Sequence, residues 1–181
     1  MLTITIPAVE AFDDEKQEFI ILKKEQTLQL EHSLVSISKW ESKWCKPFLS
    51  RTEMTFEETL YYVKCMTVTP NVDPNIYIHL TRKNFDEINK YIESPMTATT
   101  FYELGPKKPN NETVTSELIY YWMIALNIPM ECQKWHLNRL LTLIRVCNIK
   151  NTPPKKMSKR ETMSRNAALN AARKKQFNTT G

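Results

Sequence analysis

The hydrophobic pattern at the start of the chain has the period of β-strands. Apolar and polar residues alternate over residues 2–6 and stop at a proline, which predicts a half-buried strand. Residues 19–22 and 27–30 are typical of two more extended segments, joined by a polar turn at residues 23–26. An acidic loop is expected at residues 13–15. The N-terminal part of the chain therefore predicts a small antiparallel sheet.

From residue 30 onward the hydrophobic pattern takes the period of an amphipathic helix. Apolar residues recur at intervals of three and four until Pro47 ends the pattern. Trp40 and Trp44 lie one helical turn apart and make an aromatic ridge. Such a stripe usually packs in a core, and the alternative is a groove for a ligand or partner. The apolar positions are Leu30, Leu34, Ile37, Trp40, Trp44 and Phe48.

Capping signals predict three more helical segments before residue 95. Thr55 and Glu58 have the spacing of a capping box, so a helix is expected to run to about residue 66. The Asp-Pro pair at residues 73–74 predicts a short helical piece through residue 80. The next helix is expected to begin at Thr81 or Asn84 and to end before residue 95. Its buried side comprises Phe85, Ile88, Tyr91 and Ile92.

Two longer helices are expected to form a pair near the end of the globular part. The first is capped by Thr115 and is apolar on most of its sides, which predicts a central position. The second is expected over residues 131–147, with Asn148 in the place that a glycine often takes after a helix. Trp122 and Trp135 lie one in each helix and are expected to anchor the core.

These elements predict one globular domain and one appendage. Residues 1–150 are expected to form an α+β domain that is mainly α, in which the small sheet precedes a compact helical part. A loop with strong turn signals occupies residues 105–111. Pro153-Pro154 makes a stiff linker that a helix cannot cross. Residues 151–181 then comprise this linker and a basic C-terminal helical arm, whose apolar face is too thin to require a core.

The positive charge of the chain is concentrated in this arm. The 181 residues carry a formal net charge of +5, of which residues 153–181 contribute +7 and the rest contributes −2. Such asymmetry is typical of an arm that binds an acidic protein or a nucleic acid, and the plain alternative is a solubilising tail. Phe177 is its only aromatic residue, so it lacks the interleaved rings of single-strand binders. The basic residues are Lys155, Lys156, Lys159, Arg160, Arg165, Arg173, Lys174 and Lys175.

Candidate catalytic and metal-binding residues are few. The chain has only two glycines, which excludes the glycine-rich loops of P-loop and dinucleotide-binding enzymes. Cys132 and His136 have a spacing compatible with two metal ligands on one helix. Cys147 lies about 16 Å further along that helix, outside one coordination sphere. No hydrolase or protease motif is present. We therefore expect no enzyme activity, no cofactor and no metal.

Targeting signals are also lacking. The first residues do not combine a basic start with an apolar run, and no apolar stretch approaches 18 residues. We therefore expect a cytosolic protein that does not enter a membrane, with its four cysteines reduced.

Four segments of the chain resemble one protein family. They are residues 28–44 (LQLEHSLVSISKWESKW), residues 95–99 (PMTAT), residues 132–141 (CQKWHLNRLL) and the basic end from Pro153 to Lys175. Together they are similar to the tail assembly chaperones of tailed bacteriophages over most of the chain. The resemblance implies a non-enzymatic factor in the host cytoplasm. Such a factor binds the long helical tape-measure protein while tail-tube subunits polymerise around it, and it does not normally remain in the virion.

The residues themselves leave the partner open. The eight cations of the arm are the expected partner contacts, and the surface around Trp40 and Trp44 is a second candidate. The alternative function is that of a nucleic-acid-binding or head-to-tail structural protein of a phage virion, whose arm neutralises phosphates. Self-association is compatible with the same features.

Overall fold

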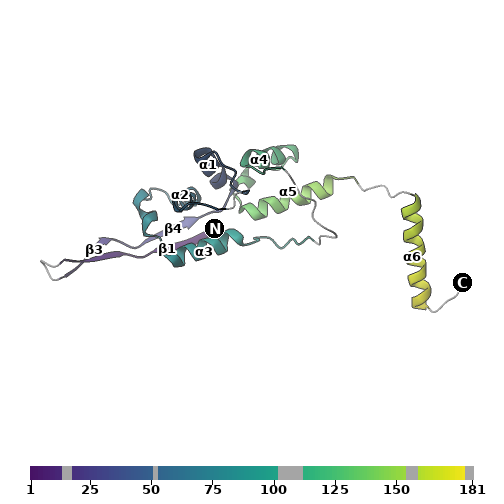
Figure 1. Ribbon diagram of the computed structural model, residues 1–181, viewed down its shortest axis with the longest axis horizontal. Coiled ribbons are helices and arrows are strands. Elements are labelled where there is room, and N and C mark those ends of the chain that lie inside the picture. The colour runs from purple at the N-terminus through teal and green to yellow at the C-terminus, as the bar shows by residue number, and fades with distance from the viewer. Residues whose placement is uncertain (14–17, 51–52, 102–111, 154–158, 178–181) are drawn as a thin grey trace. The chain divides into compact units, whose positions relative to one another are not determined.

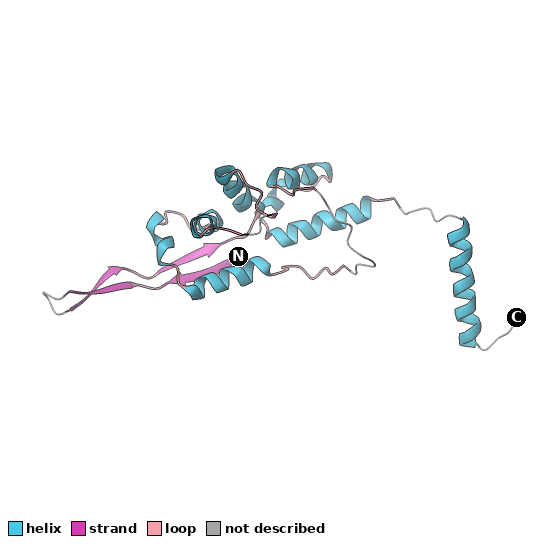
Figure 2. Cartoon of the chain, in the orientation of Figure 1, coloured by secondary structure: helices cyan, strands magenta, loops and turns pink. Residues whose placement is uncertain are grey.

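The computed structural model describes residues 1–13, 18–50, 53–101, 112–153 and 159–177 (Figure 1). The chain divides into two compact units, Met1–Asn148 and Ile149–Gly181. The predicted fold class is confirmed, because a small N-terminal antiparallel sheet is followed by helices that make up most of the regular structure (Figure 2). None of the helices in the described part of the chain is both long and apolar enough to cross a membrane.

The sheet is a long two-stranded ribbon with one interruption. β1 pairs antiparallel with β4, from Leu2 opposite Leu30 to Ile6 opposite Gln26, and β2 pairs antiparallel with β3 further along the ribbon. The interruption falls at Pro7, which has no N–H group to donate to the ladder. The strands are β1 (Leu2–Ile6), β2 (Val9–Asp13), β3 (Glu18–Lys23) and β4 (Gln26–Leu30).

Two sequence expectations for this region are wrong. Residues 23–26 do not form a turn that reverses the chain, because β3 and β4 follow one another along the same side of the ribbon. The acidic loop was expected from Asp13, but Asp13 is paired in β2 opposite Glu18. Residues 14 and 15 of that loop lie outside the described residues.

The helices begin where the sequence predicts capping. Thr55 and Glu58 form a capping box in which the Glu58 carboxylate accepts the Thr55 N–H at 2.8 Å. Asp73 and Thr115 also cap, and Thr81, not Asn84, opens the third helix. The helices of the first unit are α1 (Leu34–Trp44), α2 (Phe56–Met66), α3 (Arg82–Glu93), α4 (Ser116–Ala125) and α5 (Leu137–Asn151), with 3-10 helices η1 (Pro74–His79) and η2 (Met130–Lys134).

The helix expected over residues 131–147 is interrupted. Its first turn is the 3-10 helix η2, and α5 begins only at Leu137. The reason is a tertiary contact, since the Leu137 N–H donates to the His32 carbonyl at 2.7 Å and Ser33 forms an antiparallel bridge with His136. Asn148 does not end the helix either, because α5 continues to Asn151.

The core lies between the ribbon and the helices of the first unit. β1 and β4 bury their inward residues against α1, α2 and α3 (Figure 1). The alternation of buried and exposed residues along these two strands places every second side chain in this core. The side chains that are less than 2% exposed include Ile4, Ile6, Leu28, Leu30, Leu34, Ile37, Trp40, Ile119, Met123 and Leu140.

Helix α4 does not have the central position that its composition predicts. It buries Ile119 and Met123, but Tyr121 is 62% and Ile124 is 67% exposed. Trp122 and Trp135, which were expected to anchor the core, are only half-buried against it. The predicted pairing of core tryptophans is therefore wrong, because each ring lies at the edge of the core.

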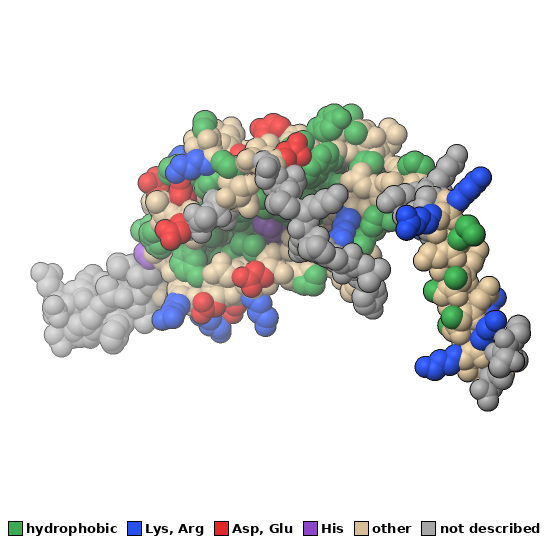
Figure 3. All heavy atoms as spheres, turned by 45° about the vertical axis from the view of Figure 1, so that its right-hand side comes forward, with side chains coloured by type: hydrophobic (Ala, Val, Ile, Leu, Met, Phe, Trp, Pro, Cys, Tyr) green, Lys and Arg blue, Asp and Glu red, His purple; other side chains and the backbone are tan. Residues whose placement is uncertain are grey.

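The second unit contains helix α6 (Lys159–Phe177). Each side chain described along this helix is exposed. Its cations project on several sides (Figure 3), so the helix has no apolar face of the kind that packs in a core.

Candidate functional site

The two tryptophans proposed as a second binding surface lie in different environments. Trp40 is 1% exposed, its Nε1 donates to the Glu58 carbonyl at 3.0 Å, and its ring packs edge-on against Phe48. Trp40 is therefore a core residue, and the expectation that it contacts a partner is wrong. Trp44 is half-buried beside Tyr61.

Lysine side chains cover the outer side of Trp44. The Lys43 Nζ lies 4.3 Å from the centroid of Tyr61 and 5.5 Å from that of Trp44. The Lys46 ammonium forms an ion pair with Glu58 at 2.7 Å, and this hydrogen bond lowers the pKa of the Glu58 carboxyl. The lysines thus stack on the rings and leave little aromatic surface for a partner.

The part of the basic arm that the structure describes in regular form is helix α6. Its helix carries six cations and one acid, Glu161. Lys155 and Lys156, which belong to the same expectation, lie outside the described residues. The six cations are Lys159, Arg160, Arg165, Arg173, Lys174 and Lys175.

The first unit has a surface site that the sequence did not reveal. Two hollows, of about 440 Å³ and about 210 Å³, share Met1, Glu31 and Lys134 in their linings and so lie next to each other. We name the two hollows together the cationic groove. Lys39 lines one end of it, and Trp135 and Arg139 line the other. Its lining also includes Val35, Cys65, Met66, Val68 and Met96.

The charges in the cationic groove are unbalanced. Lys39, Lys134 and Arg139 are exposed, and within the described ranges no acidic side chain forms an ion pair with them. The one acid in the lining, Glu31, is already engaged. It pairs with the Met1 amino group at 3.1 Å and accepts a hydrogen bond from the Tyr91 hydroxyl at 2.6 Å. Three cations therefore remain available to an anionic group.

Apolar side chains lie between these cations. The Arg139 guanidinium stacks 4.2 Å from the centroid of the Trp135 ring, and both residues line the groove. Met96 is 42% exposed and has a φ of 47°, a left-handed conformation that is rare outside glycine and asparagine. Residues held in such a conformation are over-represented at binding sites. The groove thus combines positive charge with an aromatic and a thioether surface.

A buried histidine pair supports the groove from below. The rings of His32 and His136 lie 5.0 Å apart. His136 Nδ1 accepts the Asn138 N–H at 3.3 Å, so its proton is on Nε2 and is donated to the Tyr91 carbonyl at 3.0 Å. Burial lowers the pKa of His136. This neutral imidazole fixes the start of α5 and therefore the positions of Trp135 and Arg139.

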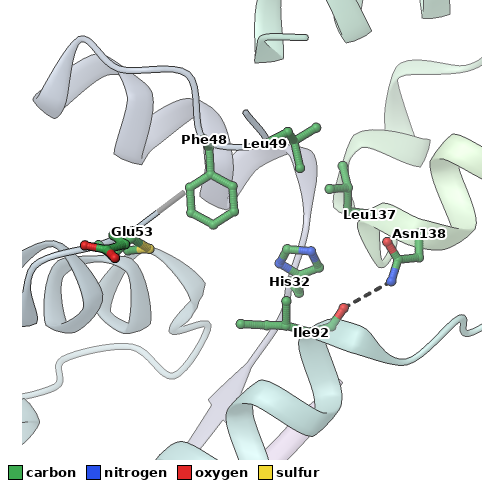
Figure 4. Close-up of a pocket in the computed structure, with 8 residues that line it drawn as sticks. His32, Phe48, Leu49, Glu53, Ile92, Leu137 and Asn138 are labelled. Atoms are coloured by element: carbon green, nitrogen blue, oxygen red, sulfur yellow. Dashed lines mark hydrogen bonds between the residues drawn. The ribbon is translucent and has the colours of Figure 1, made fainter. Parts of the chain in front are cut away.

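A separate cavity, which His32 helps to line, is shown in Figure 4. It has a volume of about 460 Å³ and is walled mainly by apolar side chains. Its amide, Asn138, donates to the Ile92 carbonyl at 3.0 Å and to the Ser94 carbonyl at 2.8 Å. These two hydrogen bonds connect α5 to the end of α3. The cavity is lined by His32, Phe48, Leu49, Glu53, Met54, Ile92, Leu137 and Asn138.

The structure also bears on the candidate metal ligands. Cys132 lies in η2 and His136 lies between η2 and α5, so they do not share a helix face. In the described residues, no three or more His, Cys, Asp or Glu side chains come together in a way that could hold a metal ion.

The cationic groove escaped the sequence analysis because five separate segments build it. Three of them overlap segments on which the expected family resemblance rests: Glu31 in residues 28–44, Met96 in residues 95–99, and Trp135 with Arg139 in residues 132–141. The sequence does not show that these segments meet at one surface, because only the fold brings them together.

Comparison of the chain with protein-family models, with curated proteins and with solved structures gave no match in any of the three.

Proposed function

We propose that the protein is a tail assembly chaperone of a tailed bacteriophage, which binds the tape-measure protein in the host cytoplasm through its basic arm. It acts by binding, without catalysis, and leaves before the virion is complete. The observation that carries the proposal is α6, a 19-residue helix whose described side chains are all exposed and which has a net charge of +5.

The composition of α6 suits a long charged partner. A helix that is polar on all sides gains little from packing, so its order depends on what binds it. Cations on several sides can meet carboxylates on more than one helix of a partner. Binding by such an arm gives a fast, salt-sensitive association, which is suited to a factor that must later be released.

The surface of the first unit is consistent with the same proposal. The segments expected to resemble tail assembly chaperones contribute residues to the cationic groove and include most of the basic arm. The cationic surfaces of the chain, where an acidic partner would bind, therefore draw on these segments.

The experiment compares the full chain with a chain ending at Thr152, one residue after the end of α5. Binding to the tape-measure protein of the same phage is measured by calorimetry at low and high salt. We expect the shortened chain to keep its melting temperature and to bind at least about tenfold more weakly. The loss should be larger at low salt, where charge attraction is least screened.

A full-length variant with Lys159, Lys174 and Lys175 changed to Arg is the matched control, because it keeps the charge of α6. Normal binding by the shortened chain would refute the role of the arm. Binding of duplex DNA by the full chain, with a log–log salt slope of about −0.9 for each phosphate contacted, would favour the alternative of a nucleic-acid-binding virion protein.

A further inference from the structure

We propose that the β2–β3 end of the ribbon of one copy docks into the cationic groove of a second copy, so that the chain associates with itself. The inference uses neither α6 nor the tape-measure protein, and it stands or falls separately from the proposed function.

The β2–β3 segment projects from the rest of the first unit. Among the described strands, β2 and β3 pair only with each other, and the ribbon extends beyond the helices that cover β1 and β4 (Figures 1 and 2). An isolated two-stranded ribbon is marginally stable in water. A second surface that holds it would supply the missing stabilisation.

The β2–β3 segment is acidic, so a surface that binds it should be cationic. β2 and β3 carry three acids, Glu10, Asp13 and Glu18, against one base, Lys23. The register places Asp13 opposite Glu18, and like charges in directly opposed positions destabilise a strand pair. Cations from another molecule would relieve this repulsion.

The same segment has an apolar component. Its register pairs Phe12 with Phe19 and Ala11 with Ile20. A site for it must therefore offer apolar contact as well as positive charge.

The cationic groove has both properties. Its lining has three cationic side chains, Lys39, Lys134 and Arg139, and one acidic side chain, Glu31, which is paired with the amino group of Met1. The Trp135 ring and Met96 supply the apolar surface between them. A basic depression and an acidic projection are therefore present on the same chain.

A chain cannot place its own ribbon in its own groove. Met1 and Glu31, which line the groove, lie at the Leu2–Leu30 end of the β1–β4 ladder. β2 and β3 leave from the opposite end, and the ribbon of 13 residues on one side is about 40 Å long. Folding back would break the ladder. The occupant must come from a second copy, in a reciprocal pair or in a head-to-tail assembly.

The experiment measures the mass of the full chain in solution by light scattering and sedimentation, as a function of concentration and salt. We expect the wild type to exceed the 21.3 kDa of a monomer at about 100 μM, and to dissociate at high salt. The groove variant is Lys39→Glu with Lys134→Glu, and the ribbon variant is Asp13→Lys with Glu18→Lys. Each alone should be monomeric, and an equal mixture of the two should associate again.

Lys83→Glu with Lys90→Glu, both exposed on α3, is the matched control and should associate like the wild type. A wild type that stays monomeric at about 100 μM would overturn the proposal. An equal loss of association in the control would also overturn it. The same holds if the mixture of the two charge variants remains monomeric while circular dichroism shows that each variant is folded.

Discussion

Glu41 joins three parts of the first unit, and its replacement should cost much of the stability of that unit. Its side chain is 7% exposed in α1. One carboxylate oxygen accepts the N–H of Phe48 at 2.7 Å, and the other accepts the N–H of Ser116, also at 2.7 Å. Ser116 is the first residue of α4, so the carboxylate also lies at the positive end of that helix.

The cost can be worked out from these two bonds. Hydrogen bonds to a charged group contribute about 1.5–3 kcal/mol each, so Glu41→Ala should lower the free energy of unfolding by about 3–6 kcal/mol. That is a large part of the 5–15 kcal/mol typical of a domain. Glu41→Gln keeps one acceptor and turns a donor toward the other N–H, so it should cost about half as much.

The assay is urea unfolding followed by tryptophan fluorescence, with hydrogen exchange of the two amides as a local probe. Glu93→Ala removes an exposed carboxylate at the end of α3 and is the matched control, with an expected change within about 0.5 kcal/mol. A loss below about 1 kcal/mol for Glu41→Ala would show that water replaces the carboxylate and would refute the argument.

Three further predictions concern acid sensitivity and the aromatic residues. Burial lowers the pKa of His136, whereas the same side chain in the unfolded chain binds a proton near pH 6.5, so the stability of the protein should fall as the pH drops below that value. His136→Gln should weaken this pH dependence and His79→Gln should not. Thermal melts from about pH 5 to 8 measure the effect. Glu58, whose pKa is lowered by its hydrogen bond with Lys46, should add a second loss of stability below its ordinary value of 4.5, and Glu58→Gln should remove that loss in thermal melts extended down to about pH 3. Trp40→Ala should cost about 3–5 kcal/mol in urea unfolding, and Trp122→Ala, at a half-buried site, clearly less; equal costs would contradict the assigned burial.

The elements that sequence analysis predicted correctly depend on local chemistry. The capping box at Thr55 and Glu58 forms within one helical turn, and the alternation over residues 2–6 needs only one buried face. The pattern of the helix from Leu34 to Trp44 is likewise local. Such signals are complete within a few residues, so they can be read without knowledge of the fold.

The errors arose where a distant segment decides the local structure. His136 leaves the helical path because it bridges to Ser33, which no local pattern reveals. β2 was missed because its acidic end has the composition of a loop, and its pairing with β3 overrides that composition. The exposed side of α4 could not be distinguished from its buried side, since both are apolar. The cationic groove shares this cause, because its residues become neighbours only through the fold.

The bond between Leu137 and the carbonyl of His32 has a consequence for how the protein is made. The two residues are separated by on the order of 100 residues, and a ribosome adds about 5–20 residues per second, so roughly 5–20 s pass between the synthesis of one and that of the other. During that interval α1 lacks its contacts with α4 and η2. The apolar surface that those elements cover then remains open to other nascent chains, so the early part of translation is the period in which this protein is most prone to aggregation.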